Sequence, residues 1–105
     1  MTEPAGFREA LLEAVDYGLM VLGEIVRQAI YQRIESTRQV KREQIPDKLE
    51  SFHEALRGML GAGAKVIEKQ IAKNLYGRLS LNFTDNANWT IVEYFDLAKK
   101  LNGRG

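Results

Sequence analysis

The sequence predicts an all-α domain of four main helices, in which a long N-terminal helix packs against a bundle of the other three. Three observations support this prediction. Apolar residues recur every three or four positions along most of the 105-residue chain. No segment alternates apolar and polar residues for long enough to form a sheet. Glycine, proline and asparagine separate the periodic segments. The length fits a single domain over residues 1–105, with an ordered core over about 7–101.

The first predicted helix covers residues 7–35. Its apolar stripe consists of Phe7, Leu11, Val15, Leu19, Leu22, Val26 and Ile30, with Ala14, Ile25 and Ala29 beside it. Such a helix would be more than about 40 Å long, which exceeds the diameter of a compact domain of this size. Gly18 and Gly23 lie inside it, where each costs about 1 kcal/mol relative to alanine. We expect these glycines to permit a close helix contact or a bend.

Three shorter helices follow, and they are predicted over 48–60, 62–79 and 88–101. Pro46 interrupts the periodic pattern in the segment 36–47. Asp47 is expected to cap the next helix, because Glu50 stands three residues later as in a capping box. The composition of the segment 80–88 is that of a loop, and Trp89 is expected in the first turn of the last helix.

The composition excludes several kinds of chemistry. Cysteine is absent and His53 is the only histidine, which excludes disulfides, thiol nucleophiles and a multi-histidine metal site within one chain. Fifteen basic and fourteen acidic residues leave a net charge of +1, without the basic excess of a general nucleic-acid binder. No apolar run approaches the ~20 residues that span a bilayer, and the first residues lack the apolar segment of a signal peptide. We therefore expect a cytoplasmic protein that has no membrane association and no cofactor.

The stretch GMLGAGAKVIEK, residues 58–69, resembles a phosphate-binding loop at first sight. A Walker-type loop ends in Gly-Lys-Ser/Thr, but here alanine precedes Lys65, and Val66 stands in place of the hydroxyl residue. Such a loop also follows a strand, whereas a helix is predicted before this one. We interpret the stretch as a tight corner in which Gly61 is left-handed and Gly63 leaves room for close packing. An anion at the start of the next helix stays physically possible.

His53 is predicted on the helix over 48–60, beside apolar residues. It could act as a general base, but the pattern suggests no serine or second histidine near it. We interpret it as a residue at the edge of the core, bonded to a backbone carbonyl. A pocket that groups His53 with an acid and a loop asparagine would instead favour an enzyme. We expect no catalytic residue and no metal site.

A second, narrower strip of the predicted first helix is a candidate protein interface. Aromatic and apolar residues flanked by polar ones favour this interpretation, and the strip consists of Tyr17, Met20, Val21, Glu24 and Tyr31. The excess length of the helix points the same way, because a homodimer would cover the overhang. The alternatives are that another helix of the same chain covers the strip, or that its residues are exposed singly.

Basic residues form a second candidate surface. Together with Tyr76 they could follow a nucleic-acid backbone, and they are Arg38, Lys41, Arg42, Lys65, Lys69 and Lys73. A solvated helix face is the simpler interpretation for a chain with almost no net charge.

Three stretches together resemble a small archaeal family, the Nitrosopumilus output domain type. They are LGEIVRQAIYQRIE, VKREQIPDKLESFHEALRGMLGAGAKVIEKQIAKNLYGRL and NWTIVEYFDLAKKL. The resemblance covers residues 7–101 or so. It implies a small helical domain that occurs at the ends of signalling and regulatory proteins and as a short stand-alone protein, and it carries over no catalytic residue.

From the sequence we therefore expect a non-catalytic interaction or regulatory module, which pairs with itself or with another protein through its first helix. A nucleic-acid-binding protein and a small-ligand-binding domain are the alternatives.

Overall fold

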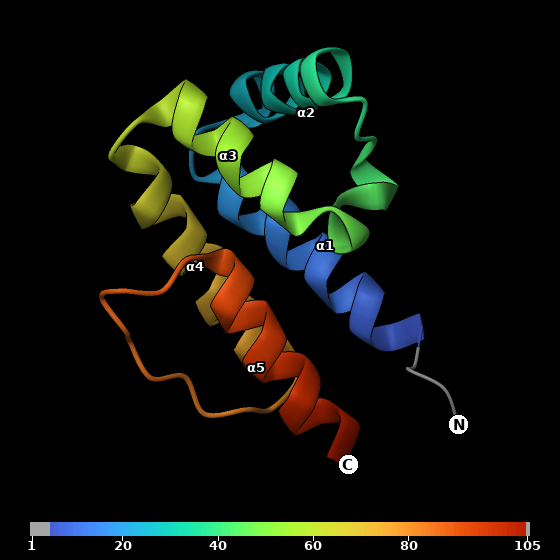
Figure 1. Ribbon diagram of the computed structural model, residues 1–105, viewed down its shortest axis with the longest axis vertical. Coiled ribbons are helices and arrows are strands. Elements are labelled where there is room, and N and C mark those ends of the chain that lie inside the picture. The colour runs from blue at the N-terminus through green and yellow to red at the C-terminus, as the bar shows by residue number, and fades with distance from the viewer. Residues whose placement is uncertain (1–4, 105) are drawn as a thin grey trace.

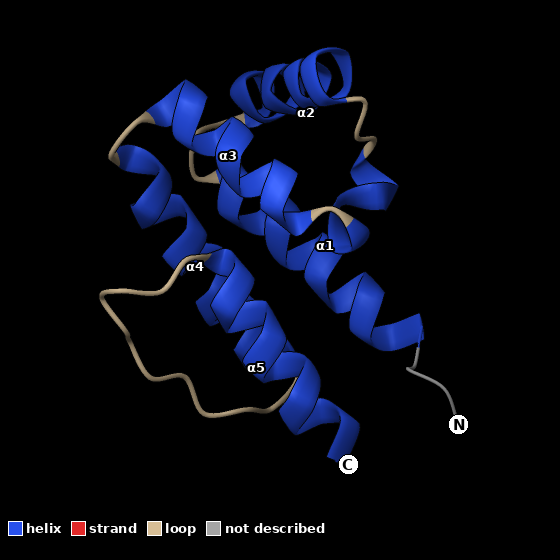
Figure 2. Cartoon of the chain, in the orientation of Figure 1, coloured by secondary structure: helices blue, strands red, loops and turns tan. Residues whose placement is uncertain are grey.

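Residues 5–104 are described by the computed structural model, and they form five α-helices and one short 3₁₀ helix (Figure 1). The helices are α1 (Ala5–Met20), α2 (Glu24–Arg38), η1 (Arg42–Asp47), α3 (Leu49–Leu60), α4 (Gly63–Arg78) and α5 (Ile91–Arg104). This range contains no strand (Figure 2). The all-α class is confirmed, but residues 5–104 divide into six helices where we expected four.

The long helix predicted over 7–35 is broken in two, which corrects the expectation of a single rod. Leu22 N donates to Leu19 O at 2.9 Å and Gly23 N donates to Met20 O at 2.9 Å, so the chain turns before α2 begins. Gly23 has a φ of 99°, which residues with a Cβ rarely adopt. The turn sends α2 crosswise over α1 and α3 (Figure 1). The longest dimension of the folded chain is therefore only 36 Å.

The most extensive helix contact joins α1 and α4, and Gly18 lies in it. A Cβ built on Gly18 would lie 2.4 Å from Cγ1 of the fully buried Ile71. Only glycine therefore lets these two helices approach so closely. At the edge of the same interface, Arg78 Nη1 lies 2.6 Å from Glu13 Oε1. Gly18 therefore permits the expected close helix contact, and Gly23 permits the expected bend.

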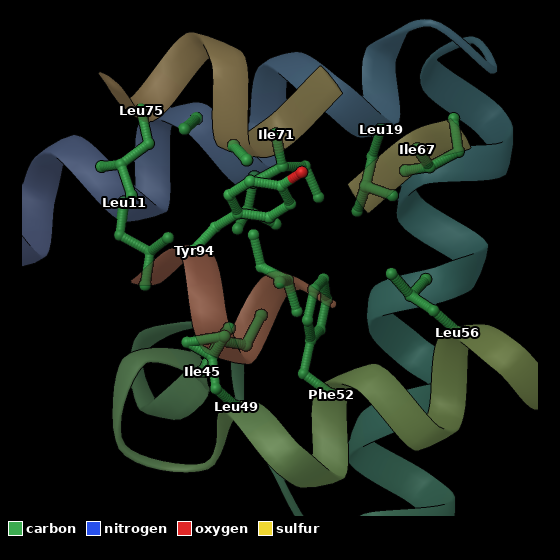
Figure 3. Packing of buried hydrophobic residues seen from close by; sticks show 14 of the residues in the cluster. Leu11, Leu19, Ile45, Leu49, Phe52, Leu56, Ile67, Ile71, Leu75 and Tyr94 are labelled. Atoms are coloured by element: carbon green, nitrogen blue, oxygen red, sulfur yellow. The ribbon is translucent and has the colours of Figure 1, made fainter. Parts of the chain in front are cut away.

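The buried side chains form one cluster to which every helix contributes (Figure 3). Tyr94 of α5 points into this cluster among residues of α1, α3 and α4. Its backbone carbonyl accepts a hydrogen bond from the hydroxyl of Tyr76 at 2.7 Å. Its own hydroxyl accepts a hydrogen bond from Asn86 N at 2.8 Å. The irregular segment 79–90 is therefore fixed to the core through α5.

Two helix starts differ from the prediction. Asp47 does not cap α3, because it ends η1 and its Oδ1 lies 2.8 Å from Arg8 Nη1. α5 begins at Ile91 and not at residue 88, because Thr90 and Glu93 form its cap. Glu93 Oε1 accepts a hydrogen bond from Thr90 N at 2.7 Å, while Thr90 Oγ1 accepts one from the amide two residues later at 3.1 Å.

Replacing Gly18 with alanine is expected to lower the free energy of unfolding by about 1–3 kcal/mol, because the new methyl group would push Ile71 out of its packing position. Gly77 is the matched control, since it also lies in a helix and a Cβ there would meet nothing within 4 Å. Gly77→Ala should raise the free energy of unfolding by about 0.5–1 kcal/mol. Urea unfolding followed by circular dichroism measures both variants. A Gly18→Ala protein as stable as Gly77→Ala would contradict the close contact.

Candidate functional site

Exposed apolar side chains gather where α1 turns into α2. Seven large apolar side chains are exposed among the described residues. Five of the seven lie between positions 17 and 26, and we call these five the apolar corner: Tyr17, Met20, Val21, Ile25 and Val26. Ile25 is 85% exposed and Val21 is 62% exposed. Such a concentration of exposed apolar surface is typical of a binding surface.

A groove of about 540 Å³ continues from the apolar corner along α2. Ile25 and Val26 belong to both features, and Ala29 of α2 and Met59 of α3 extend the apolar wall. The other end of the groove is polar, where Arg33 lines it with two uncharged neighbours. The corner and the groove together therefore form one apolar surface with a polar end.

The structure places the predicted interface residues in two different environments. Tyr17, Met20 and Val21 are exposed in the apolar corner. Glu24 is exposed beside them, and its carboxylate accepts hydrogen bonds from Arg27 and Gln28. Tyr31 lies elsewhere: it is partly buried and packs against the core. Tyr31 is therefore left out of the apolar corner.

The sequence pattern missed Ile25 and Val26, since it assigned Val26 to the buried stripe and Ile25 to the positions beside it. That assignment continued the helical period through Gly23. The turn at Gly23 ends the period, so the first residues of α2 face solvent instead. Gly23 itself is the signal that could have revealed the exposure of Ile25 and Val26, because a glycine within a helical pattern can end one helix before the next begins.

The carboxylate of Asp16 links α1, α2 and η1. It accepts hydrogen bonds from Arg42 Nε at 3.1 Å and Arg42 Nη2 at 2.6 Å, and a further one from the hydroxyl of Tyr31. Arg27 Nη1 lies 3.5 Å from the same carboxylate. Burial acts to raise the pKa of Asp16, but the bonds from Arg42 and Tyr31 and the nearby positive charges hold it below its ordinary value. Burial, together with Asp16, also raises the pKa of Tyr31.

Replacing Asp16 with asparagine is expected to lower the free energy of unfolding by about 2 kcal/mol at neutral pH, because Arg42 would lose a charged acceptor. A carboxyl group whose pKa is lowered by folding stabilises the fold above its ordinary pKa, and this contribution is lost as the pH falls through the folded value. The difference between native protein and variant should therefore shrink as the pH falls toward about 3. Urea unfolding at both pH values measures it.

Asp47→Asn is the control for this experiment. It removes an exposed ion pair with Arg8 and should cost much less stability than the change at Asp16. Equal losses from the two variants, or a loss at Asp16 that persists unchanged in acid, would show that the Asp16 charge does not hold α2.

The predicted nucleic-acid contacts do not form one continuous surface. The segment between α2 and η1, which carries Lys41, and helix α4, which carries Lys65 and Lys73, lie on opposite sides of the molecule in Figure 1. Three of the six cations are in ion pairs: Arg38 with Glu54, Arg42 with Asp16, and Lys69 with Asp85. These pairings reduce the positive charge that a phosphate backbone would meet. Nucleic-acid binding stays a prediction from the sequence.

A cleft of about 400 Å³ lies between the α3–α4 corner and the end of the loop before α5. α3, α4 and the loop all contribute side chains to it. Its lining consists of His53, Arg57, Gly61, Ala62, Lys65, Glu68, Ala87, Asn88, Trp89 and Thr90. The cleft therefore groups the single histidine with an acid and a loop asparagine, which is the arrangement that we expected to favour an enzyme.

His53 and Glu68 form the floor of this cleft. Glu68 is only 3% exposed, and its Oε2 lies 2.6 Å from His53 Nδ1. Its Oε1 accepts a hydrogen bond from the amide of Ile91 at 3.1 Å. His53 therefore bonds to a buried carboxylate and not to a backbone carbonyl, which corrects the expectation. With Nδ1 engaged, Nε2 is the ring nitrogen for which the described residues offer no hydrogen-bond partner.

The burial of Glu68 could have been predicted from its position in the sequence. Glu68 lies on the buried face of α4, next to Ile67 and one turn before Ala72. Acids rarely occupy such a face unless they are paired. A charged residue in an apolar stripe, with a histidine on the preceding helix, indicates a buried pair of this kind.

The glycine-rich corner forms one wall of the cleft. Gly61 has a positive φ of 57°, as expected for the residue that ends α3, but its ψ of −131° places it outside the left-handed helical region. A Cβ on Gly63 would meet only Leu60, at 3.8 Å, so the expected close packing at Gly63 is absent. The N-cap of α4, Ala62, provides no side-chain hydrogen bond to the first amides of the helix.

No protein-family model, curated protein or solved structure matches this chain. The resemblance to the archaeal output-domain family accordingly stays a prediction. None of the described helices is both long enough and apolar enough to cross a membrane. Over the same part of the chain, no group of three or more acidic and histidine side chains is placed to hold a metal ion.

Proposed function

We propose that the protein is a helical interaction module that pairs with a second copy of itself through the apolar corner and the adjoining groove. The observation that carries this proposal is that five of the seven exposed large apolar side chains lie within positions 17–26. Scattered exposed apolar residues are ordinary, whereas a contiguous set favours an interface. The proposal no longer depends on the length of a single first helix, because that helix is broken at Gly23.

The corner offers both parts of a self-complementary contact. Ile25 projects from the surface, and the groove beside it is lined by Val26, Ala29 and Met59. In a two-fold arrangement, Ile25 of each copy packs into the groove of the other. An interface of this kind uses the same patch on both partners. The short side chain of Ala29 leaves space for the incoming isoleucine.

The charges around the corner suit a second copy as well. Glu24 stands in the first turn of α2, and Arg33 lines the polar end of the groove. In a two-fold dimer, Glu24 of each copy can therefore lie opposite Arg33 of the other copy, which gives two such pairs. Charges at the rim guide the encounter of the partners, while the buried apolar centre supplies most of the affinity.

Ile25→Glu is expected to convert a dimer into a monomer, because a carboxylate in the centre of the interface would be buried without a partner. We expect the native protein to have the mass of two chains at about 100 µM and to dissociate on dilution. Sedimentation equilibrium measures both proteins. Tyr17→Glu and Met20→Glu should weaken the pairing in the same direction.

Val66→Glu is the matched control, since Val66 is as exposed as Val21 but lies on α4 and outside the corner. This variant should keep the mass of two chains. A native protein with the mass of one chain across the whole concentration range would remove the proposal. A dimer that survives Ile25→Glu would show that another surface is used.

A further inference from the structure

We infer that the cleft above His53 and Glu68 is a binding site for a small organic anion, namely a flat ring that carries a phosphate or a carboxylate group. The inference concerns a different surface from the apolar corner, because the two share no lining residue. It holds or fails independently of self-association.

The accessible charge of the cleft is positive. Arg57 and Lys65 both line it, and neither is in an ion pair with any residue that the structure describes. The one acid in the lining, Glu68, is buried, and each of its oxygens already has a partner within the protein. Two further acids lie close by: Glu93 is engaged as the cap of α5, and Asp85, near Lys65, is in an ion pair with Lys69. Guanidinium and ammonium groups that face a cleft without partners are typical ligands of phosphates and carboxylates.

The start of helix α4 reinforces this charge at one wall. Gly61 and Ala62 line the cleft where α4 begins, and no side chain caps that helix start. The amides of Ala64 and Lys65 already donate to the carbonyls of Gly61 and Ala62, so this helix start attracts an anion chiefly through the positive end of its dipole. Lys65 stands in the first turn of the same helix, so the helix start and a lysine meet at the same part of the cleft.

The floor of the cleft consists of a buried acid and the ring that it holds in place. Burying a carboxylate costs several kcal/mol, and replacing such a pair with apolar residues is often neutral or stabilising. Here the carboxylate fixes the orientation of the His53 ring through a 2.6 Å contact to Nδ1. The remaining ring nitrogen, Nε2, is then a positioned hydrogen-bonding group for a ligand. Polar pairs beneath a cleft are typical of binding sites.

Trp89 supplies the apolar side of the site. It is half-buried, and its ring packs edge-on against Tyr94 with centroids 5.2 Å apart. This contact holds the indole in place at the cleft, where a flat ring can stack on it. The volume of about 400 Å³ lies within the range of small-molecule pockets. The combination of an aromatic wall and two cations selects a ring with an anionic group over either part alone.

The test uses Trp89, the only tryptophan of the chain, as a fluorescent reporter. Phenyl phosphate and benzoate carry both recognition elements, inorganic phosphate carries only the charge, and benzyl alcohol carries only the ring. We expect a saturable change with the two ring anions and at least about tenfold weaker binding of the other two probes. No saturation with either ring anion, or equal binding of benzyl alcohol, would overturn the inference. Comparison of phenyl phosphate with benzoate identifies which anionic group is preferred.

Variants locate the binding. Lys65→Ala and Arg57→Ala should each weaken the binding of phenyl phosphate by about tenfold, because each removes one charge-assisted contact. Lys73→Ala is the matched control, since it removes the same charge from an exposed position of α4 outside the cleft, and it should change the affinity less than about twofold. An equal effect of Lys65→Ala and Lys73→Ala would show attraction by overall charge and overturn the assignment of the site. Both cations are exposed, so circular dichroism should show unchanged folding.

Discussion

The close approach of α1 and α4 at Gly18 is the constraint on which the rest of the fold depends. With no side chain at this position, Ile71 fills the space against α1, and the α1–α4 interface becomes the largest in the molecule. α3 and α5 then pack on α4 and on one another. Because a protein interior packs at nearly crystalline density, an added methyl group at Gly18 would displace Ile71 and the part of α4 on which α3 and α5 pack. The buried core is arranged around this contact.

Helix α2 depends on different interactions. It buries only Ile30 and Ile34, so apolar packing holds it less firmly than the other helices. The turn at Gly23 gives its direction, and the carboxylate of Asp16 ties its middle and the following segment to α1 through Tyr31 and Arg42. A helix held at its middle by polar contacts can leave its first turn uncovered. The exposed Ile25 follows from this mode of attachment.

Local signals predicted much of the fold and little of the site. The boundaries of α3 and α4 lie within one residue of those predicted, because their apolar period and the glycine corner between them are encoded in adjacent residues. The break at Gly23 was missed, since a glycine is compatible with a helix and only the tertiary packing selects its positive φ. The capping of α5 by Thr90 was missed for a similar reason. An acid on the apolar face of α4 indicates a buried partner, but the pairing of Glu68 with His53 joins two helices across a corner, and the position of His53 at the edge of the core suggested a backbone carbonyl instead. That long-range contact required the three-dimensional arrangement.

The buried carboxylate of Glu68 also has a consequence for how the helices are joined. One of its oxygens contacts the His53 ring and the other receives the first amide of α5. The imidazole and the first amide of the last helix are therefore joined through a single side chain. The same helix carries Tyr94, whose hydroxyl accepts a hydrogen bond from the long irregular segment. Helices α3, α4 and α5 thus meet at this one carboxylate.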